Sequence, residues 1–222
     1  LFYTLLVVIS SEECKWLNKM NKRDLSMKLN GEGLHRQLTV SLSLGSIERL
    51  IECRVLYMLT VPEGMYIDSD SINSSLYRHS FHSRHYFDIE APAHLSKSHQ
   101  VSIASTSMTR KQFILSDSFT IPIHLRYHPS SSKGETTISI PRILIDCPVD
   151  YTIHSLHLCH TASVKSVSSF APKWVILPLL SSSSSITVSI PTGDKTMIYP
   201  VVGITFTILI LSIIYLCKTL YY

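Results

Sequence analysis

The sequence predicts a mainly β protein, with an antiparallel β-sandwich-like domain followed by one C-terminal transmembrane helix. Apolar and polar residues alternate along several segments, which is typical of half-buried strands. Only 16% of the 222 residues are charged, whereas ordinary soluble domains carry about 25%. The mean hydropathy of +0.20 therefore indicates a membrane segment. The chain is too short for a multi-span transporter, but it can hold one domain and one anchor.

The first ten residues are predicted to be part of a secretory signal peptide. Residues 1–9 form an uncharged apolar run that is too short to cross about 30 Å of hydrocarbon. The run is long enough for the core of a signal peptide, and Val8 and Ser10 fit the positions before a cleavage site. A buried first strand is the alternative. Residues 11–29 follow as an N-terminal segment for which we expect disorder.

Residues 30–196 are expected to form the β domain. The clearest alternation runs through residues 38–44, 51–61 and 119–127. Such alternation places one face of a strand on a core and the other in solvent, as in antiparallel sheets. Several short strands separated by turns are typical of a β-sandwich. Further short strands are predicted at residues 101–103, 136–140, 143–145, 174–177 and 186–190.

The segment 197–217 is predicted to be a transmembrane helix. It is uncharged, and about 20 residues at 1.5 Å each cross the hydrocarbon core. Tyr199 and Tyr221 lie near its two edges, where interfacial aromatic residues are common. Together with a signal peptide, this helix predicts a single-pass type I protein whose body lies in the lumen. Residues 218–222 would then form a cytosolic tail.

A glycosylphosphatidylinositol attachment signal could use the same residues. Residues 181–185 supply small side chains, residues 186–196 a polar spacer, and the following segment an apolar tail. However, such signals usually end with apolar residues, whereas this chain continues through Lys218. A retained helix is therefore the favoured interpretation.

Two covalent modifications are expected in an oxidising, luminal compartment. Asn73 begins the single Asn-x-Ser/Thr sequence and is a candidate glycosylation site. Of the five cysteines, Cys217 lies at the cytosolic edge of the predicted helix. The other four are candidate disulfide cysteines: Cys14, Cys53, Cys147 and Cys159. Four cysteines allow three pairings, and the sequence does not choose among them.

No metal site is predicted, although the chain has 11 histidines. Two groups recur at three-residue spacing: His79, His82 and His85, and His154, His157 and His160. Ligands at this spacing share a face only on a helix, and neither segment has the apolar periodicity of a helix. Exposed loop histidines are the simpler interpretation.

No catalytic residues and no cofactor are predicted. Asp68 and Asp70 could hold a divalent cation in a luminal transferase. However, paired acids are common in turns, and no second carboxylate cluster supports them. The sequence has no Gly-rich phosphate loop and no Gly-x-Ser-x-Gly motif. It also has no block of Lys and Arg of the kind that binds nucleic acid.

Several segments resemble the PIG-X family. The most specific are Phe-Asp-Ile-Glu-Ala-Pro at 87–92 and His-Leu-Arg-Tyr-His-Pro at 124–129. Order and spacing agree over residues 30–222, and the remaining similar segments are residues 33–36, 53–56, 61–68 and 190–193. The resemblance implies a non-catalytic subunit of glycosylphosphatidylinositol (GPI) mannosyltransferase I in the endoplasmic reticulum membrane. It also implies a partner, the multi-span catalytic subunit, which adds the first mannose to the glycolipid.

The resemblance makes a stabilising accessory subunit the leading hypothesis, in contact with the lipid bilayer and with the catalytic subunit. Glu90, Arg126 and His128 are the candidate partner contacts, because they are polar residues in the most similar segments. They are expected to lie in turns or on the outer face of strands. The alternative function is a cell-surface β-sandwich interaction protein with a single span or a lipid anchor.

Overall fold

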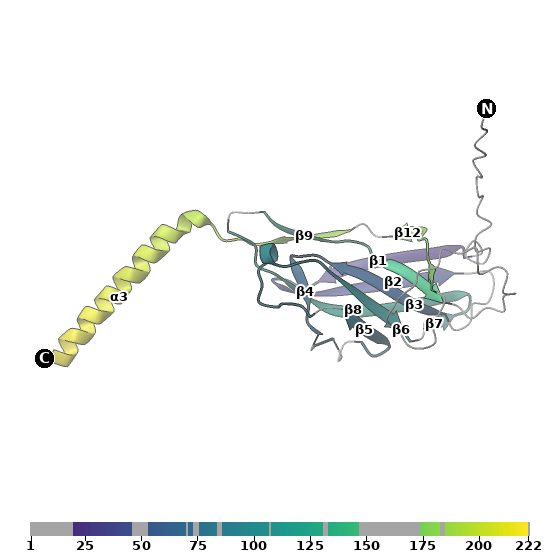
Figure 1. The fold of residues 1–222 in the computed structure, drawn as a ribbon, viewed down its shortest axis with the longest axis horizontal. Coiled ribbons are helices and arrows are strands. Elements are labelled where there is room, and N and C mark those ends of the chain that lie inside the picture. The colour runs from purple at the N-terminus through teal and green to yellow at the C-terminus, as the bar shows by residue number, and fades with distance from the viewer. Residues whose placement is uncertain are drawn as a thin grey trace, which may run out of the picture.

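The computed structural model describes residues 20–45, 53–69, 71–72, 76–83, 86–106, 108–130, 133–146, 174–182 and 185–221. Within these residues, two β-sheets pack face to face and a long C-terminal helix extends away from them (Figure 1). The prediction of a mainly β domain with a C-terminal helix is confirmed. The predicted signal peptide at residues 1–10 lies outside the described residues.

The first sheet has the strand order β12-β1-β2-β8-β4, and β7 also pairs with β8. Its strands are β1 (Lys22–Asn30), β2 (His35–Gly45), β4 (Met65–Ile67), β7 (Thr109–Lys111), β8 (Ile114–Leu125) and β12 (Ser181–Ser182). The pairing of β1 with β12 is parallel, and the other pairings are antiparallel. The β2–β8 ladder runs from the pair His35–His124 to the pair Gly45–Ile114, and it forms the centre of the sheet.

The second sheet has the strand order β11-β10-β3-β6-β5, and all of its pairings are antiparallel. Its strands are β3 (Arg54–Val61), β5 (His79–Ser83), β6 (His99–Ser105), β10 (Arg142–Asp146) and β11 (Val175–Ile176). A separate ladder joins β9 (Gly134–Ile138) to β13 (Ile186–Ile190).

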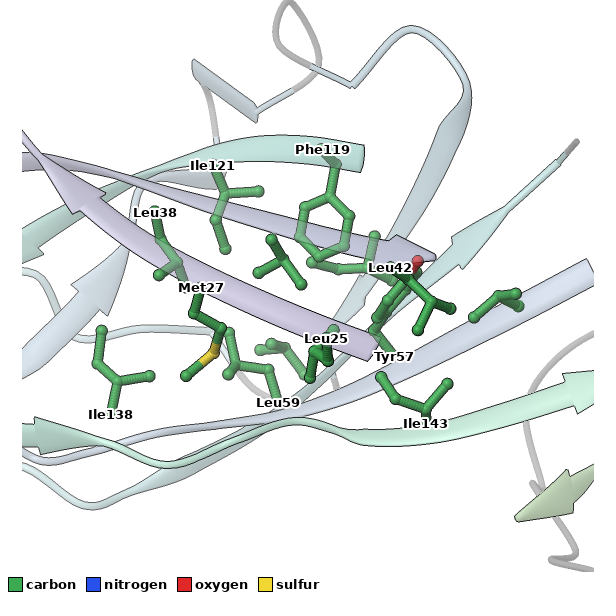
Figure 2. Close-up of a cluster of buried hydrophobic side chains, with 14 of the residues drawn as sticks. Leu25, Met27, Leu38, Leu42, Tyr57, Leu59, Phe119, Ile121, Ile138 and Ile143 are labelled. Atoms are coloured by element: carbon green, nitrogen blue, oxygen red, sulfur yellow. The ribbon is translucent and has the colours of Figure 1, made fainter. Parts of the chain in front are cut away.

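The core fills the space between the sheets. On β2, Leu38, Leu42 and Leu44 are almost completely buried, whereas the alternating Thr39 and Ser41 are partly exposed. This is the inward apolar, outward polar pattern that the sequence predicted. Figure 2 shows core side chains from both sheets and from β9 converging on one cluster: Leu25, Met27, Leu38, Leu42, Tyr57, Leu59, Phe119, Ile121, Ile138 and Ile143.

The N-terminal boundary of the domain differs from the prediction. We expected residues 11–29 to lie outside the domain, but β1 begins at Lys22 and pairs with β2 along its whole length. Leu25 and Met27 are buried in the core, so β1 is integral to the first sheet. This strand was not predicted, because its alternation of apolar residues is short and charged residues flank it.

The C-terminal helix α3 (Ile198–Tyr221) follows a short 3₁₀ helix, η3 (Lys195–Met197). It is long and apolar enough to cross a membrane, and none of its residues is buried against the domain. At 1.5 Å per residue its 24 residues span about 36 Å. The helix therefore extends beyond Cys217, where the predicted segment ended.

The hydroxyl groups of α3 bond to the helix itself. Thr205 donates to the carbonyl of Val201, and Thr207 donates to the carbonyl of Gly203, each at 2.8 Å. Ser212 makes the same i→i−4 bond, to Ile208. These hydroxyls are satisfied without any contact to another helix.

Candidate functional site

The three candidate contacts come together at one end of the domain. Glu90 lies in the segment between β5 and β6, whereas Arg126 and His128 follow the end of β8. Arg126 Nη1 donates to the carbonyl of Ala91 at 2.6 Å, and His128 Nδ1 lies 3.0 Å from the carbonyl of Arg126. The two most specific segments of the family resemblance are thus in direct contact.

Arg126 is buried, with only 3% of its surface exposed, although we expected it in a turn or on an outer strand face. Its guanidinium donates to the carbonyls of Met65 and Ala91, and it lies 4.9 Å from the centre of the Tyr66 ring. Burial lowers the pKa of Arg126, and the negative charge of Asp88 partly opposes this shift. Arg126 therefore positions the segment around Ala91 and is not available to a partner.

Glu90 and His128 have different environments. Glu90 is exposed, and its backbone N–H donates to the carboxylate of Asp88 at 3.2 Å. His128 is half-buried beside a shallow hollow of about 310 Å³ that also contacts His94 and Thr136. Of the three candidates, Glu90 is the one whose side chain faces solvent freely.

The turn between β3 and β4 packs tightly against this end. A Cβ atom added at Gly64 would lie 2.7 Å from atoms of Thr136 and 3.1 Å from His128. Thr136 belongs to β9, and the first residue of β9, Gly134, pairs with Ile190 at the end of β13. The backbone of Gly134 approaches the carbonyl of Ile190 too closely to leave room for a Cβ atom. Glycine at these two positions lets the loops pack against the strand that leads to α3.

A row of rings crosses the first sheet beside Arg126. His35 and His124 are direct neighbours on β2 and β8, with ring centres 4.3 Å apart, and Tyr66 stacks on His124 at 4.9 Å. The pKa of His124 is lowered, first by burial and then by the nearby His35, whereas Asp68 acts in the opposite direction. The row therefore favours a neutral His124.

A buried polar cluster links the two sheets. Tyr57 of β3 donates its hydroxyl to Asp117 of β8 at 2.8 Å, and His79 Nε2 of β5 lies 3.0 Å from the same carboxylate oxygen. The side chains of His79 and Asp117 are each 5% exposed. The phenyl ring of Phe119 packs against the rings of both Tyr57 and His79. Sequence analysis missed this cluster, because its members come from three separate strands.

The cluster borders an open groove of about 1100 Å³. Paired hydroxyls lie on the same sheet, with Ser41 and Ser118 2.8 Å apart, and Lys22 and Lys111 also line the groove. The carboxylate of Asp117 is already occupied by Tyr57 and His79, so the cluster acts as a structural bridge between sheets. The groove therefore offers hydroxyl and ammonium groups that can form hydrogen bonds.

The acidic and histidine residues considered as metal ligands are not gathered together. Asp68 accepts a hydrogen bond from the hydroxyl of Ser71 at 2.8 Å, which is the role of a turn or cap residue. Asp70 and His85 lie outside the described residues, as do His154, His157 and His160. In the ranges that the structure describes, no three His, Cys, Asp or Glu side chains could hold a metal ion.

The predicted modification sites are only partly described. Cys53 is buried and forms a disulfide, and Cys217 is free and exposed on α3. The candidate disulfide cysteines Cys14, Cys147 and Cys159 lie outside the described residues, and so does the candidate glycosylation site Asn73.

Solved structures with a partly similar backbone share little sequence with this chain. A cohesin module of a family 33 glycoside hydrolase from Clostridium perfringens is 8% identical, with a TM-score of 0.34. It aligns with 78% of this chain and 98% of that module. A type II cohesin domain from Acetivibrio cellulolyticus is 10% identical, with a TM-score of 0.32, and aligns with 75% of this chain and 95% of that domain.

Sequence comparison is more specific. A human protein, "GPI alpha-1,4-mannosyltransferase I, stabilizing subunit", is 35% identical over 55% of this chain, and the match spans 49% of the human protein, about half its length. Mouse and rat proteins of the same description are 29% and 28% identical over 85% of this chain, and the matches span 75% and 76% of their lengths. The sequence profile of the PIG-X / PBN1 family matches residues 31–221, from the first turn of the domain to the end of α3. The chain therefore belongs to the PIG-X / PBN1 family.

Proposed function

We propose that this protein is a non-catalytic subunit that stabilises the catalytic subunit of GPI mannosyltransferase I. The observation that carries the proposal is the family match over residues 31–221, together with relatives described as the stabilizing subunit of that enzyme. The architecture is compatible with this role, because it combines a β domain with one helix suited to a membrane. The enzyme that it serves adds the first mannose in GPI-anchor biosynthesis.

A subunit without an active site can control an enzyme through mass action. If it binds the folded catalytic subunit and not the unfolded one, it raises the apparent stability of that subunit by about 2.7 kcal/mol at a hundredfold excess over Kd. That shift lowers the unfolded fraction about a hundredfold. In a compartment that degrades unfolded proteins, the amount of enzyme then depends on this subunit.

Depletion of the protein tests the proposal. The catalytic subunit should fall in abundance and turn over faster after translation is stopped, and GPI-anchored proteins should disappear from the cell surface. Mannose transfer by the remaining enzyme, measured in microsomes and divided by the amount of catalytic subunit, should stay unchanged. If abundance is unchanged while transfer stops, the subunit contributes to catalysis directly and the proposal is wrong.

We also propose residence in the endoplasmic reticulum membrane, with the domain in the lumen, the signal peptide removed and a glycan on Asn73. Endoglycosidase should increase the gel mobility of the wild-type protein and leave an Asn73→Gln variant unchanged. Glycans are attached only in the lumen, so a glycan on Asn73 would place the domain there. Protease added outside sealed microsomes should then leave the domain intact. Digestion of the domain by external protease would contradict this orientation.

Retention of α3 separates this topology from a lipid anchor. An epitope placed after Tyr222 should remain on the mature protein, because the helix would stay in the membrane. Loss of the epitope, together with release of the domain by a phosphatidylinositol-specific lipase, would instead indicate a GPI-linked protein.

A further inference from the structure

The end of the domain that carries Glu90 is also the end from which the membrane helix leaves. Residues 191–194 alone separate β13 from η3, and β4 and β9 lie at this end (Figure 1). Since an extended chain spans at most about 3.5 Å per residue, the five steps from Ile190 to Lys195 reach no farther than about 17 Å. We call this part of the domain, formed by residues 62–64, 86–96 and 126–130, the anchor end. It must stay close to the bilayer surface.

The anchor end exposes large apolar side chains. Ile89 is 61% exposed, Leu95 is 70% exposed and Tyr127 is 71% exposed. The segments that carry them are joined, because the N–H of Ala93 donates to the carbonyl of Tyr127 at 3.0 Å. We call Ile89, Leu95 and Tyr127 the apolar rim. Exposed apolar groups gathered in one region are typical of interaction sites.

The rim is held by a well-bonded framework. Asp88 accepts hydrogen bonds from the N–H groups of Glu90 and Ala91, each at 3.2 Å. The short helix η1 (Ala93–Leu95) is closed by the N–H of Ser96, which donates to the carbonyls of Pro92 and Ala93. The bond from buried Arg126 to Ala91 ties this framework to the end of β8. A preorganised surface loses less conformational entropy when it binds a partner.

The charges around the rim favour a protein partner over lipid. Segments that insert into bilayer surfaces surround their apolar residues with Lys and Arg. Residues 86–98 instead contain two carboxylates, Asp88 and Glu90, and one Lys, Lys97, all of them exposed. With Lys97 as its only Lys or Arg, this stretch lacks the cationic border of a bilayer-binding segment, whereas its two exposed carboxylates suit a protein surface with an apolar hollow bordered by cationic side chains.

We propose that the apolar rim docks onto the catalytic subunit just outside the bilayer, with Ile89 and Leu95 in an apolar hollow and Glu90 facing a cationic group. This inference rests on the proposed function and names the surface that would perform it. In this arrangement the membrane helix keeps the domain near the catalytic subunit, and the anchor end makes the specific contact.

An Ile89→Asp/Leu95→Asp variant of the full-length chain tests the docking surface in cells depleted of the native protein. Because both side chains are exposed, the variant should fold and keep the melting temperature of the wild type. Its yield of co-purified catalytic subunit in mild detergent should fall at least tenfold, and the catalytic subunit should drop to the level of depleted cells.

The matched control is Phe113→Asp. Phe113 is 60% exposed in the turn between β7 and β8, so the control adds the same kind of charge to an equally exposed apolar site. It lies at the opposite end of β8, whose 12 residues span about 37 Å. The control should retain the catalytic subunit at the wild-type level. If both variants keep the catalytic subunit at the wild-type level, the apolar rim is not the docking surface. If both variants lose it, the effect is not specific to the anchor end, and the proposed location is wrong.

Hydrogen exchange on the full-length protein supplies a test that needs no substitution. Amides of residues 86–98 should gain protection in nanodiscs that contain the catalytic subunit, but not in nanodiscs with lipid alone. Protection by lipid alone would show that the rim contacts the bilayer and would overturn the inference. If depletion of the protein leaves the catalytic subunit unchanged, the proposed function itself fails. If depletion lowers it while the rim variant restores it, only the docking surface fails.

Discussion

Removal of one hydroxyl group from the core should measure how strongly the two sheets are held together. In Tyr57→Phe, Asp117 loses the hydrogen bond that Tyr57 donates at 2.8 Å, in a site where the tyrosine is fully buried. A hydrogen bond to a charged group contributes about 1.5–3 kcal/mol. Because His79 still contacts the carboxylate at 3.0 Å, we expect the lower part of this range, about 1.5–2 kcal/mol.

For a domain of this size, 1 kcal/mol corresponds to about 2–4 °C in melting temperature, so Tyr57→Phe should lower the Tm by about 3–8 °C. Differential scanning fluorimetry of the full-length protein in detergent would measure this shift. Tyr127→Phe is the matched control, because its ring is exposed, and its Tm should equal that of the wild type. Equal melting temperatures for Tyr57→Phe and the wild type would refute the bridging role of Asp117.

The pair Tyr57 and Asp117 also predicts how the stability of the domain changes at alkaline pH. Burial, and secondarily the charge and hydrogen bond of Asp117, raise the pKa of Tyr57 well above its usual value. The folded protein therefore holds this proton more tightly than the unfolded chain, whose tyrosine ionises near pH 10. The corresponding stability is complete below about pH 10 and is lost as the pH rises further. Tyr57→Phe should lose less stability above pH 10 than the wild type does. Identical plots of Tm against pH for the two proteins would argue against a raised pKa of Tyr57.

Three further predictions concern other parts of the domain. Gly134→Ala places a Cβ atom against the carbonyl of Ile190 and 2.8 Å from the Thr192 side chain. Thermal unfolding should therefore show that the free energy of unfolding falls by about 1–3 kcal/mol. An unchanged Tm would contradict this packing. Because the pKa of His124 is lowered, mainly by burial, its contribution to stability is complete above about pH 6.5 and is lost as the pH falls below that value. The decrease in Tm from pH 7 to pH 5 should therefore be smaller in His124→Gln, and parallel profiles would rule out this contribution. Cys53 forms a disulfide and directly precedes Arg54, which pairs with Asp146, and in the sequence Cys147 directly follows Asp146. We therefore expect non-reducing peptide mapping to recover a Cys53–Cys147 link, not one to Cys14 or Cys159.

The central strands of the domain were predictable because they are long. In β2, β3 and β8 the apolar residues alternate over seven or more positions, which is too long a pattern to arise readily by chance. β1 has only two fully buried side chains, Leu25 and Met27, between charged residues, so its pattern was too short to recognise. The three-residue strands β4 and β7 are defined by their pairing with β8, which no local pattern records.

The environments of the candidate residues could not be read from the sequence. The structure brings the two similar segments, 87–92 and 124–129, into contact through the bond from Arg126 to Ala91. That their polar residues contact a partner stays a prediction. The burial of Arg126 could not be predicted, because it depends on the carbonyls of Met65 and Ala91, which are distant in sequence. The bridge between Tyr57, Asp117 and His79 was missed for the same reason: its residues are 38 and 60 positions apart.

The self-contained hydrogen bonding of α3 has a consequence for the order of assembly. Polar groups left unpaired in hydrocarbon favour the association of membrane helices. Thr205, Thr207 and Ser212 are already bonded within the helix, so in lipid these three hydroxyls would not require a second helix as a partner. If the chain stabilises a catalytic subunit as proposed, a newly made copy could persist in the membrane before it meets that subunit. Supply of this subunit would then not have to be synchronised with supply of the enzyme.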